Sequence, residues 1–160
     1  MRIVRFKADS RPRYGLLEGK TIHGLKISPF AQHPGNKSQP SLDGNKYGLD
    51  NVKLLAPCTP SKVICLGVNY RSHAIETGLA IPPVPLIFLK PPTAVIGPED
   101  KIELPRQEKR RVDYEAELGV VIGRRTRDIS RERAKDCVLG YTCFNDVSER
   151  YAQKHDGQWT

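Results

Sequence analysis

The sequence predicts an α+β fold that is mainly β, with a small β-rich N-terminal domain at residues 1–55 and a second domain at residues 56–160. Short alternating or apolar runs recur along the chain, whereas patterns typical of helices are few and short. Residues 28–51 are rich in Pro, Gly, Asn, Ser and Lys, which indicates a loop or linker between the two parts. The order of elements does not match a doubly wound parallel sheet.

The composition indicates a soluble globular protein, with 38% hydrophobic and 28% charged residues among 160. No apolar run approaches the roughly 20 residues that span a bilayer, and the N-terminus lacks the apolar core of a signal peptide. We therefore expect a cytoplasmic protein with no membrane partner. The net charge is +8, but basic residues are interleaved with acidic ones and no nucleic-acid-binding motif is visible, so no nucleic-acid partner is expected.

Four cysteines, Cys58, Cys65, Cys137 and Cys143, have spacings that match neither a zinc site nor a Cys-x-x-Cys redox motif. Each lies among apolar or loop residues. We therefore predict buried free thiols.

In the N-terminal domain, three short strands are predicted at residues 1–7, 14–17 and 21–25. Residues 18–20 contain Gly19 and predict a hairpin turn between the last two strands. The strand predicted at residues 52–57 follows the linker and enters the second domain.

In the second domain, apolar runs of strand length predict further strands at residues 62–68, 86–90, 101–104 and 141–144. Asn69 is a candidate N-cap for a helix at 70–77 that Gly78 would end. Ser130 is the equivalent cap for a helix at 131–139, with Gly140 at its end. Three prolines make residues 81–85 an extended loop, and residues 106–111 read as a charged turn.

Residues 112–123 read as one strand with two distinct faces. One face is apolar and suited to a core, and it comprises Val112, Tyr114, Ala116, Leu118, Val120 and Ile122. Asp113, Glu115 and Glu117 line the other face, where carboxylates about 6.5 Å apart would repel each other unless a cation lies between them. The pattern fits either a solvent-facing polar stripe or a site for a hard metal ion.

Other polar residues occur at positions where chemistry is possible. His73 and Glu76 share one face of the predicted short helix, as an acid–base pair or as a surface pair. Lys90 ends an apolar strand, so its ammonium either reaches the surface or binds an anion. Asp146 follows a strand, and Arg150 and Gln153 would face the same way if the next segment is helical. The sequence contains no Gly-rich phosphate loop, no Gly-x-Ser-x-Gly motif and no His-Glu-x-x-His motif.

Taken together and in order, five motifs resemble the fumarylacetoacetate hydrolase family, at residues 62–73, 86–92, 112–118, 140–148 and 156–160. Residues 1–55 are similar to the small N-terminal domain of many of its members. The resemblance implies a mixed β-sheet roll with few short helices. Because family members continue well past the residue that corresponds to Thr160, we expect the roll to be incomplete at the C-terminal end of this chain.

The resemblance also implies roles for individual residues. Glu115, Glu117 and Asp146 match the ligands of one divalent cation, and three hard oxygen donors suit Mg²⁺, Mn²⁺ or Ca²⁺. His73 matches the general base, and Glu76 matches the residue that orients it. The positions that line the substrate site are Lys90, Arg150 and Gln153.

The activity that follows is metal-dependent hydrolysis of a C–C bond in acylpyruvate-like or fumarylacetoacetate-like 1,3-dioxo acids. The alternatives are isomerisation or decarboxylation of 2-oxo or 2-hydroxy-dienoic acids at the same site, and an inactive truncated module that associates through unpaired strand edges. By analogy with relatives, we expect a homodimer.

Overall fold

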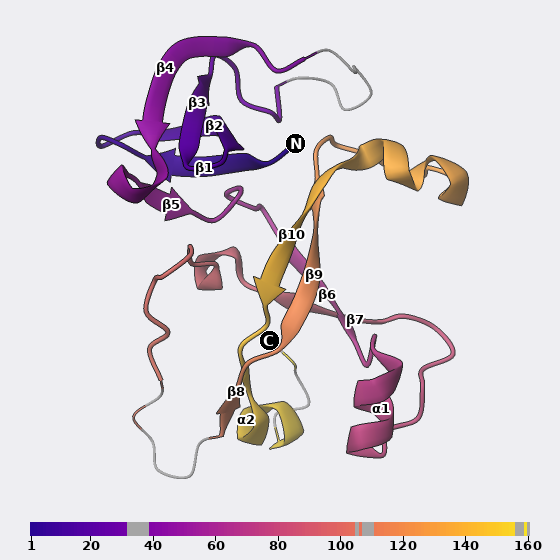
Figure 1. Ribbon diagram of the computed structural model, residues 1–160. Coiled ribbons are helices and arrows are strands. Elements are labelled where there is room, and N and C mark those ends of the chain that lie inside the picture. Colours follow the sequence, from indigo (N-terminus) through magenta and orange to yellow (C-terminus); the bar gives the residue numbers. More distant parts are fainter. Residues whose placement is uncertain (32–38, 105, 107–110, 156–158, 160) are drawn as a thin grey trace. The chain divides into compact units, whose positions relative to one another are not determined.

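The computed structural model describes residues 1–31, 39–104, 106, 111–155 and 159 (Figure 1). These residues form two compact units. One comprises residues 1–58, 96–101 and 116–145, and the other comprises residues 59–95, 102–115 and 146–160. Short strands dominate both units and the helices are short, so the prediction of a mainly β fold is confirmed. Within the described residues, no helix is long and apolar enough to cross a membrane.

The N-terminal part of the first unit is a five-stranded antiparallel sheet in the order β4-β3-β2-β1-β5. Its strands are β1 (Ile3–Lys7), β2 (Pro12–Glu18), β3 (Thr21–Leu25), β4 (Leu42–Gly48) and β5 (Lys53–Leu55). Phe6 and Ile22 are fully buried, and the Phe6 ring lies 5.0 Å from that of Tyr47. Gly15 is required beside this small core, because a Cβ there would collide with Ile22.

The structure confirms the three predicted N-terminal strands and the turn at Gly19, whose φ is +57°. It corrects the predicted linker. β4 and the 3₁₀ helix η1 (Leu49–Asn51) lie within residues 28–51, whereas residues 32–38 lie outside the described part. β4 has the sequence LDGNKYG, which contains few strand-forming residues, and it is stabilised by pairing with β3 and by the packing of Tyr47.

The first unit also contains the hairpin of β9 (Ala116–Ile122) and β10 (Val138–Asn145), which pair from Ala116↔Asn145 to Ile122↔Val138. The predicted helix at 131–139 is wrong in type and length, because η3 (Arg131–Cys137) is a 3₁₀ helix and Gly140 lies inside β10. Ser130 precedes η3 but makes no side-chain cap hydrogen bond. Pairing with β9 therefore overrides the expected helix end.

The period-two alternation of β9 is present, but the face that was expected in the core is the exposed one. Leu118 is 63% exposed, and Val120 and Ile122 are each about half exposed. Tyr114 was expected on the same face and is also exposed. Within the described residues no element covers this apolar face. Periodicity therefore predicted correctly which residues share a face, but it did not predict which face is buried.

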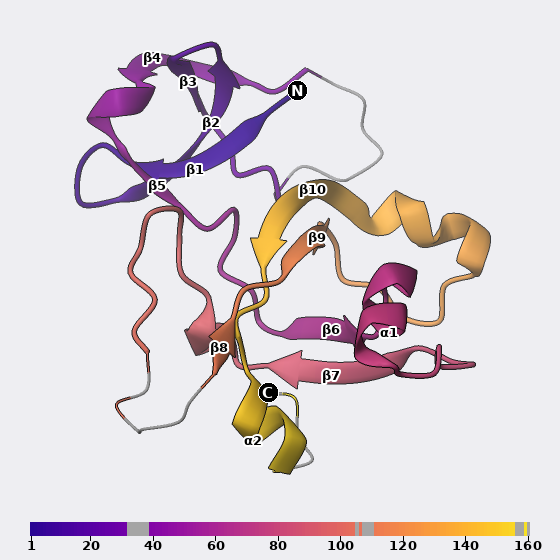
Figure 2. The ribbon, with the colours of Figure 1, turned by 60° about the horizontal axis from the view of Figure 1, so that its bottom comes forward.

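The second unit is built on the antiparallel hairpin of β6 (Val63–Gly67) and β7 (Leu86–Lys90), which Figure 2 shows side by side. On one face, Phe88 packs against Trp159, with their ring centroids 5.7 Å apart. The opposite face is exposed and carries Ile64, Leu66, Ile87 and Leu89. The remaining elements are α1 (Arg71–Thr77), η2 (Pro92–Ala94), β8 (Val112–Asp113), β11 (Ser148–Glu149) and α2 (Arg150–His155).

Helix α1 agrees with the predicted helix at 70–77, and Gly78 ends it in the left-handed conformation with φ +68°. The N-cap residue is Tyr70 rather than Asn69, and its side chain makes no cap hydrogen bond. Residues 81–85 form no strand, as their prolines predicted. The described residues 101–104 form no strand either, which corrects that prediction. Residues 107–110 of the predicted charged turn lie outside the described part.

The predicted strand at 112–123 is divided, since β8 ends at Asp113 and β9 begins at Ala116. β8 pairs with β11 and β9 pairs with β10, so each half has its own partner. The cysteine prediction holds in part. None of the four cysteines, all of which the structure describes, forms a disulfide bond; Cys65 and Cys137 are buried, but Cys58 is half-buried and Cys143 is exposed.

Candidate active site

Glu115 and Asp146 lie next to each other in the second unit because their backbones are hydrogen-bonded. The Asp146 amide donates to the Glu115 carbonyl at 2.9 Å. The same register continues through the β11–β8 pair Ser148↔Asp113 and ends where the Arg150 amide donates to the Arg111 carbonyl at 2.8 Å. The break between β8 and β9 therefore places Glu115 beside the residue that follows β10.

Asp146 is the most buried carboxylate of this group, with 3% of its side chain exposed. Its Oδ1 lies 2.7 Å from Lys90 Nζ, and the Lys90 side chain is 14% exposed. Lys90 Nζ donates a hydrogen bond to the Val147 carbonyl at 3.2 Å. Within the described residues Asp146 Oδ1 accepts no hydrogen bond of good geometry, so its contact with Lys90 is ionic only. A buried carboxylate oxygen in this state fits an added cation.

Arg150 binds the second carboxylate of the pair. Its Nη1 lies 2.8 Å from Glu115 Oε1, and its Nε donates to Asp113 Oδ2 at 2.9 Å. Nη1 also donates to Gln153 Oε1 at 3.1 Å, so the predicted placement of Arg150 and Gln153 on one helical segment is confirmed. Hydrogen bonds from Arg150 and, secondly, from Arg111 hold the pKa of Asp113 below its usual value.

His73 and Glu76 share one face of α1, with His73 Nδ1 3.8 Å from Glu76 Oε2. The Glu76 side chain is 82% exposed, and that of His73 is 37% exposed. In both ribbon views α1 stands apart from β8 and α2, which belong to the same unit (Figures 1 and 2). His73 and Glu76 thus share a face of α1 as the spacing predicted, and their catalytic role stays a prediction.

Glu117 lies on β9 in the first unit, where it is half-buried and pairs with Phe144 across the hairpin. In the part of the chain that the structure describes, no group of three or more His, Cys, Asp or Glu side chains could hold a metal ion. Glu115 and Asp146 lie in the second unit and Glu117 lies in the first, so the set of three ligands stays a prediction. The donor chemistry still fits a hard divalent cation, because all three are carboxylates and one has a buried oxygen that lacks a hydrogen bond.

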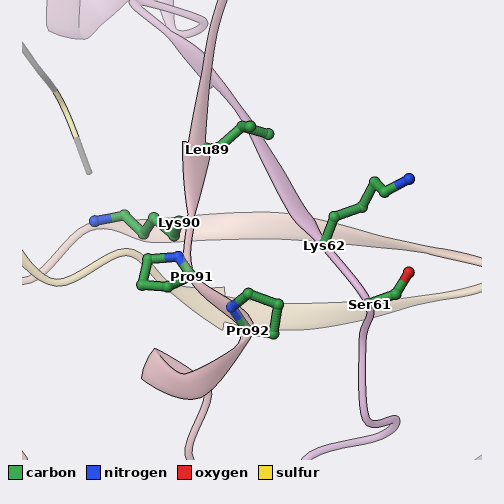
Figure 3. A pocket seen from close by; sticks show the side chains of 6 residues that line it. All are labelled: Ser61, Lys62, Leu89, Lys90, Pro91 and Pro92. Atoms are coloured by element: carbon green, nitrogen blue, oxygen red, sulfur yellow. The ribbon is translucent and has the colours of Figure 1, made fainter.

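A hollow of about 380 Å³ lies at one end of the β6–β7 hairpin, and it is lined by Ser61, Lys62, Leu89, Lys90, Pro91 and Pro92. Figure 3 shows the side chains of Lys62 and Lys90 extending in opposite directions. The Lys90 ammonium contacts Asp146 instead of a group that lines the hollow. We therefore place the candidate site at Asp146 and not in the hollow.

Two residues of this region were not assigned a site role by sequence reasoning. Asp113 was recognised only as a member of the acidic face, although its spacing of two from Glu115 already placed both carboxylates on one side. Glu149 caps α2 by accepting hydrogen bonds from the amides of Tyr151 (3.0 Å) and Ala152 (2.7 Å). An acidic residue directly before a short helix was the available signal for that role.

Comparison with known proteins shows which families and relatives this chain resembles. Residues 62–160 match the model described as fumarylacetoacetate (FAA) hydrolase, C-terminal, and residues 1–57 match the model described as Rv2993c-like, N-terminal. The chain is 43% identical over 180 residues to oxaloacetate tautomerase fahd2, mitochondrial, of Xenopus laevis, with 99% of this chain and 56% of that protein covered.

Two further similar proteins are named for other activities. The chain is 39% identical to caffeoylpyruvate hydrolase of Neonothopanus nambi, with 89% of this chain and 50% of that protein covered. A crystal structure of 5-carboxymethyl-2-hydroxymuconate delta-isomerase from Mycobacterium smegmatis superimposes with a TM-score of 0.83 at 38% identity, covering all of this chain and 60% of that one. The chain spans 47% and 60% of the length of two curated relatives that it matches, from Archaeoglobus fulgidus and Mycobacterium tuberculosis.

Proposed function

Because this chain belongs to the fumarylacetoacetate hydrolase family, we propose that it forms part of an enzyme that hydrolyses a C–C bond in acylpyruvate-like 1,3-dioxo acids. Its relatives are enzymes of this superfamily and include a tautomerase, an isomerase and a hydrolase of small organic acids. The observation that carries the proposal is the buried Asp146 carboxylate, which lies beside Glu115 and 2.7 Å from the Lys90 ammonium.

We assign the metal ligands to Glu115, Glu117 and Asp146, which would hold one Mg²⁺ or Mn²⁺, with Ca²⁺ as a further candidate. A divalent cation at this position would stabilise the negative charge that develops on the substrate oxygens. The carboxylates would also be relieved of their mutual repulsion. Their affinity for the cation depends on how far Lys90 and Arg150 already neutralise them.

The other residues have roles that follow from their charge. Lys90 and Arg150 are cations at the edge of the carboxylate group and would bind the carboxylate of an oxo acid, with Gln153 orienting Arg150. Glu76 lies beside Nδ1 of His73, which leaves Nε2 to accept a proton from water. The water oxygen bonds to the carbonyl carbon and the C–C bond breaks, with its electron pair leaving on the departing carbon as an enolate. That carbon takes up the proton that His73 removed from water, and the products are a carboxylic acid and a 2-oxo acid.

For His73 to act on substrate, α1 would have to lie over the Asp146 group, and within the described residues no printed ion pair joins His73 to that group, since His73 pairs with Glu76 and Asp146 pairs with Lys90. We propose that α1 closes over bound substrate. Isomerisation, tautomerisation or decarboxylation at the same site is the second candidate, favoured by the named activities of the relatives. A further alternative is an inactive module that only associates with other chains through unpaired strand edges. For the enzyme we propose a homodimer, by analogy with relatives.

Steady-state assays with an acylpyruvate and with oxaloacetate, each with Mn²⁺, would separate hydrolysis from tautomerisation and decarboxylation. We expect His73→Ala to abolish acylpyruvate hydrolysis and to leave Mn²⁺ binding unchanged. The matched control is His23→Ala, because His23 lies on β3 of the N-terminal sheet and has its own carboxylate neighbour, Glu18. Full hydrolysis by the His73 variant would refute its role as the base.

Thermal melts with and without Mn²⁺ test the ligand assignment without any turnover. Mn²⁺ at a hundredfold its Kd should stabilise the chain by about 2.7 kcal/mol, which is a rise of roughly 5 to 11 °C in Tm. Glu117→Ala should remove this rise, whereas Glu103→Ala, which removes an exposed carboxylate, should preserve it. A rise that survives in Glu117→Ala would exclude Glu117 as a ligand.

A further inference from the structure

The Arg150 guanidinium contacts two carboxylates, those of Asp113 and Glu115. Its Nε donates to Asp113 Oδ2 at 2.9 Å, and its Nη1 lies 2.8 Å from Glu115 Oε1. The Arg150 side chain is 19% exposed, so these contacts form in a partly desolvated position. Asp113 and Glu115 therefore share the charge of one cation.

The backbone holds this arrangement in register. Ser148 pairs with Asp113 in the β11–β8 ladder, and the Arg150 amide donates to the Arg111 carbonyl at 2.8 Å. Arg150 opens α2, whose N-terminus is capped by the Glu149 carboxylate. The strand pairing before Arg150 and the helix that begins at it thus fix its backbone. Its side-chain contacts then determine the direction of the guanidinium.

The contact between Arg150 and Asp113 affects how strongly Arg150 pairs with Glu115. A guanidinium is a planar fork, so a partner at Nε restricts the direction in which Nη1 and Nη2 point. If the Asp113 charge were removed, Glu115 would be the remaining carboxylate partner of Arg150 within the described residues. The Arg150–Glu115 pair would then strengthen, and a cation would have to compete with a full ion pair for Glu115.

We propose that Asp113 is a positioning residue: it holds Arg150 by Nε and shares the guanidinium charge, so that Glu115 is only partly neutralised and can bind a divalent cation. This inference rests on the proposed function, because it takes Glu115 as a metal ligand. Asp113 itself touches neither metal nor substrate in this role. It acts through Arg150, as residues behind metal ligands commonly do.

The test is Mn²⁺ titration of the whole chain by isothermal titration calorimetry. Asp113→Asn keeps the shape of the side chain and removes its charge, and we expect Mn²⁺ affinity to fall by about 10-fold to 100-fold. Asp113→Glu restores the charge and should recover most of the affinity. Asp136→Asn, which removes the same charge from an exposed residue of η3, should leave the affinity unchanged.

A second pair of variants separates positioning from a simple loss of negative charge near the metal. In an Arg150→Gln background, Asp113→Asn should change Mn²⁺ affinity no more than Asp136→Asn does, because there is no guanidinium left to redirect. An equal loss in both backgrounds would overturn the inference. Unchanged affinity in the Asp113→Asn single variant would overturn it as well, and the proposed metal site would stand. Absence of Mn²⁺ binding by the unaltered chain would overturn both.

Discussion

Replacing Lys90 with methionine should destabilise this protein more than any change at a surface lysine. Methionine keeps much of the apolar stem and removes the ammonium that lies 2.7 Å from Asp146 Oδ1. Asp146 is 3% exposed, so its carboxylate would lose this cation in a position that water barely reaches. Its buried Oδ1 has no hydrogen bond from the described residues to compensate for the loss.

The magnitude follows from the geometry. Two unit charges at 2.7 Å attract each other by about 6 kcal/mol at an effective dielectric constant of about 20. Desolvation offsets part of that attraction, and removing one partner of a buried pair costs about 3 to 5 kcal/mol. For a chain of this length the corresponding fall in Tm is roughly 6 to 20 °C.

The assay is urea and thermal unfolding at pH 7, followed by circular dichroism. The control is Lys20→Met, since Lys20 pairs with Asp50 at a similar distance of 3.0 Å but is 82% exposed. Surface pairs contribute little, so this variant should unfold like the unaltered chain. The double variant Lys90→Met/Asp146→Asn should recover part of the lost stability, because it leaves no unpaired buried charge. Equal effects of Lys90→Met and Lys20→Met would refute the reasoning.

Two further predictions concern packing and pH. Gly67→Ala should displace the indole of Trp159, because a Cβ at residue 67 would collide with it and would lie 3.0 Å from Leu86 Cδ2, and we expect a loss of about 1 to 3 kcal/mol. Trp159 is the one tryptophan of the sequence, so its fluorescence reports the change directly, with Gly140→Ala as control because a Cβ there meets no neighbour. Burial raises the pKa of the Cys58 thiol, so its alkylation by iodoacetamide in the folded chain should begin at higher pH than in the urea-unfolded chain. The pKa of this thiol is higher in the folded chain than in the unfolded chain. Its stabilising contribution is therefore fully present below the unfolded-state pKa and is lost as the pH rises through the folded-state pKa. Coincident alkylation profiles in the folded and unfolded chains would contradict this prediction.

Local patterns predicted the elements that are bounded by strong local signals. The β3 and β7 ranges, the end of α1 at Gly78 and the turn at Gly19 all agree with the structure, since apolar runs and glycine conformations act over a few neighbouring residues. β4 was missed because its residues are poor strand formers, and its pairing with β3 supplies what its own sequence lacks. The divided strand at 112–123 was missed because the two halves find different partners.

The sequence by itself determined which side chains share a face, such as His73 with Glu76, and which motifs assign the chain to its family. Only the tertiary structure decided that Lys90 meets Asp146 and that Arg150 binds Asp113 and Glu115 together. It also decided that Leu118 and its neighbours on β9 lie on an exposed face. The physical reason is the distance along the chain over which each kind of information acts. Periodicity depends on residues a few positions apart, whereas these contacts join segments about 35 to 55 residues apart. Strand register brings those segments together, and no local pattern encodes it.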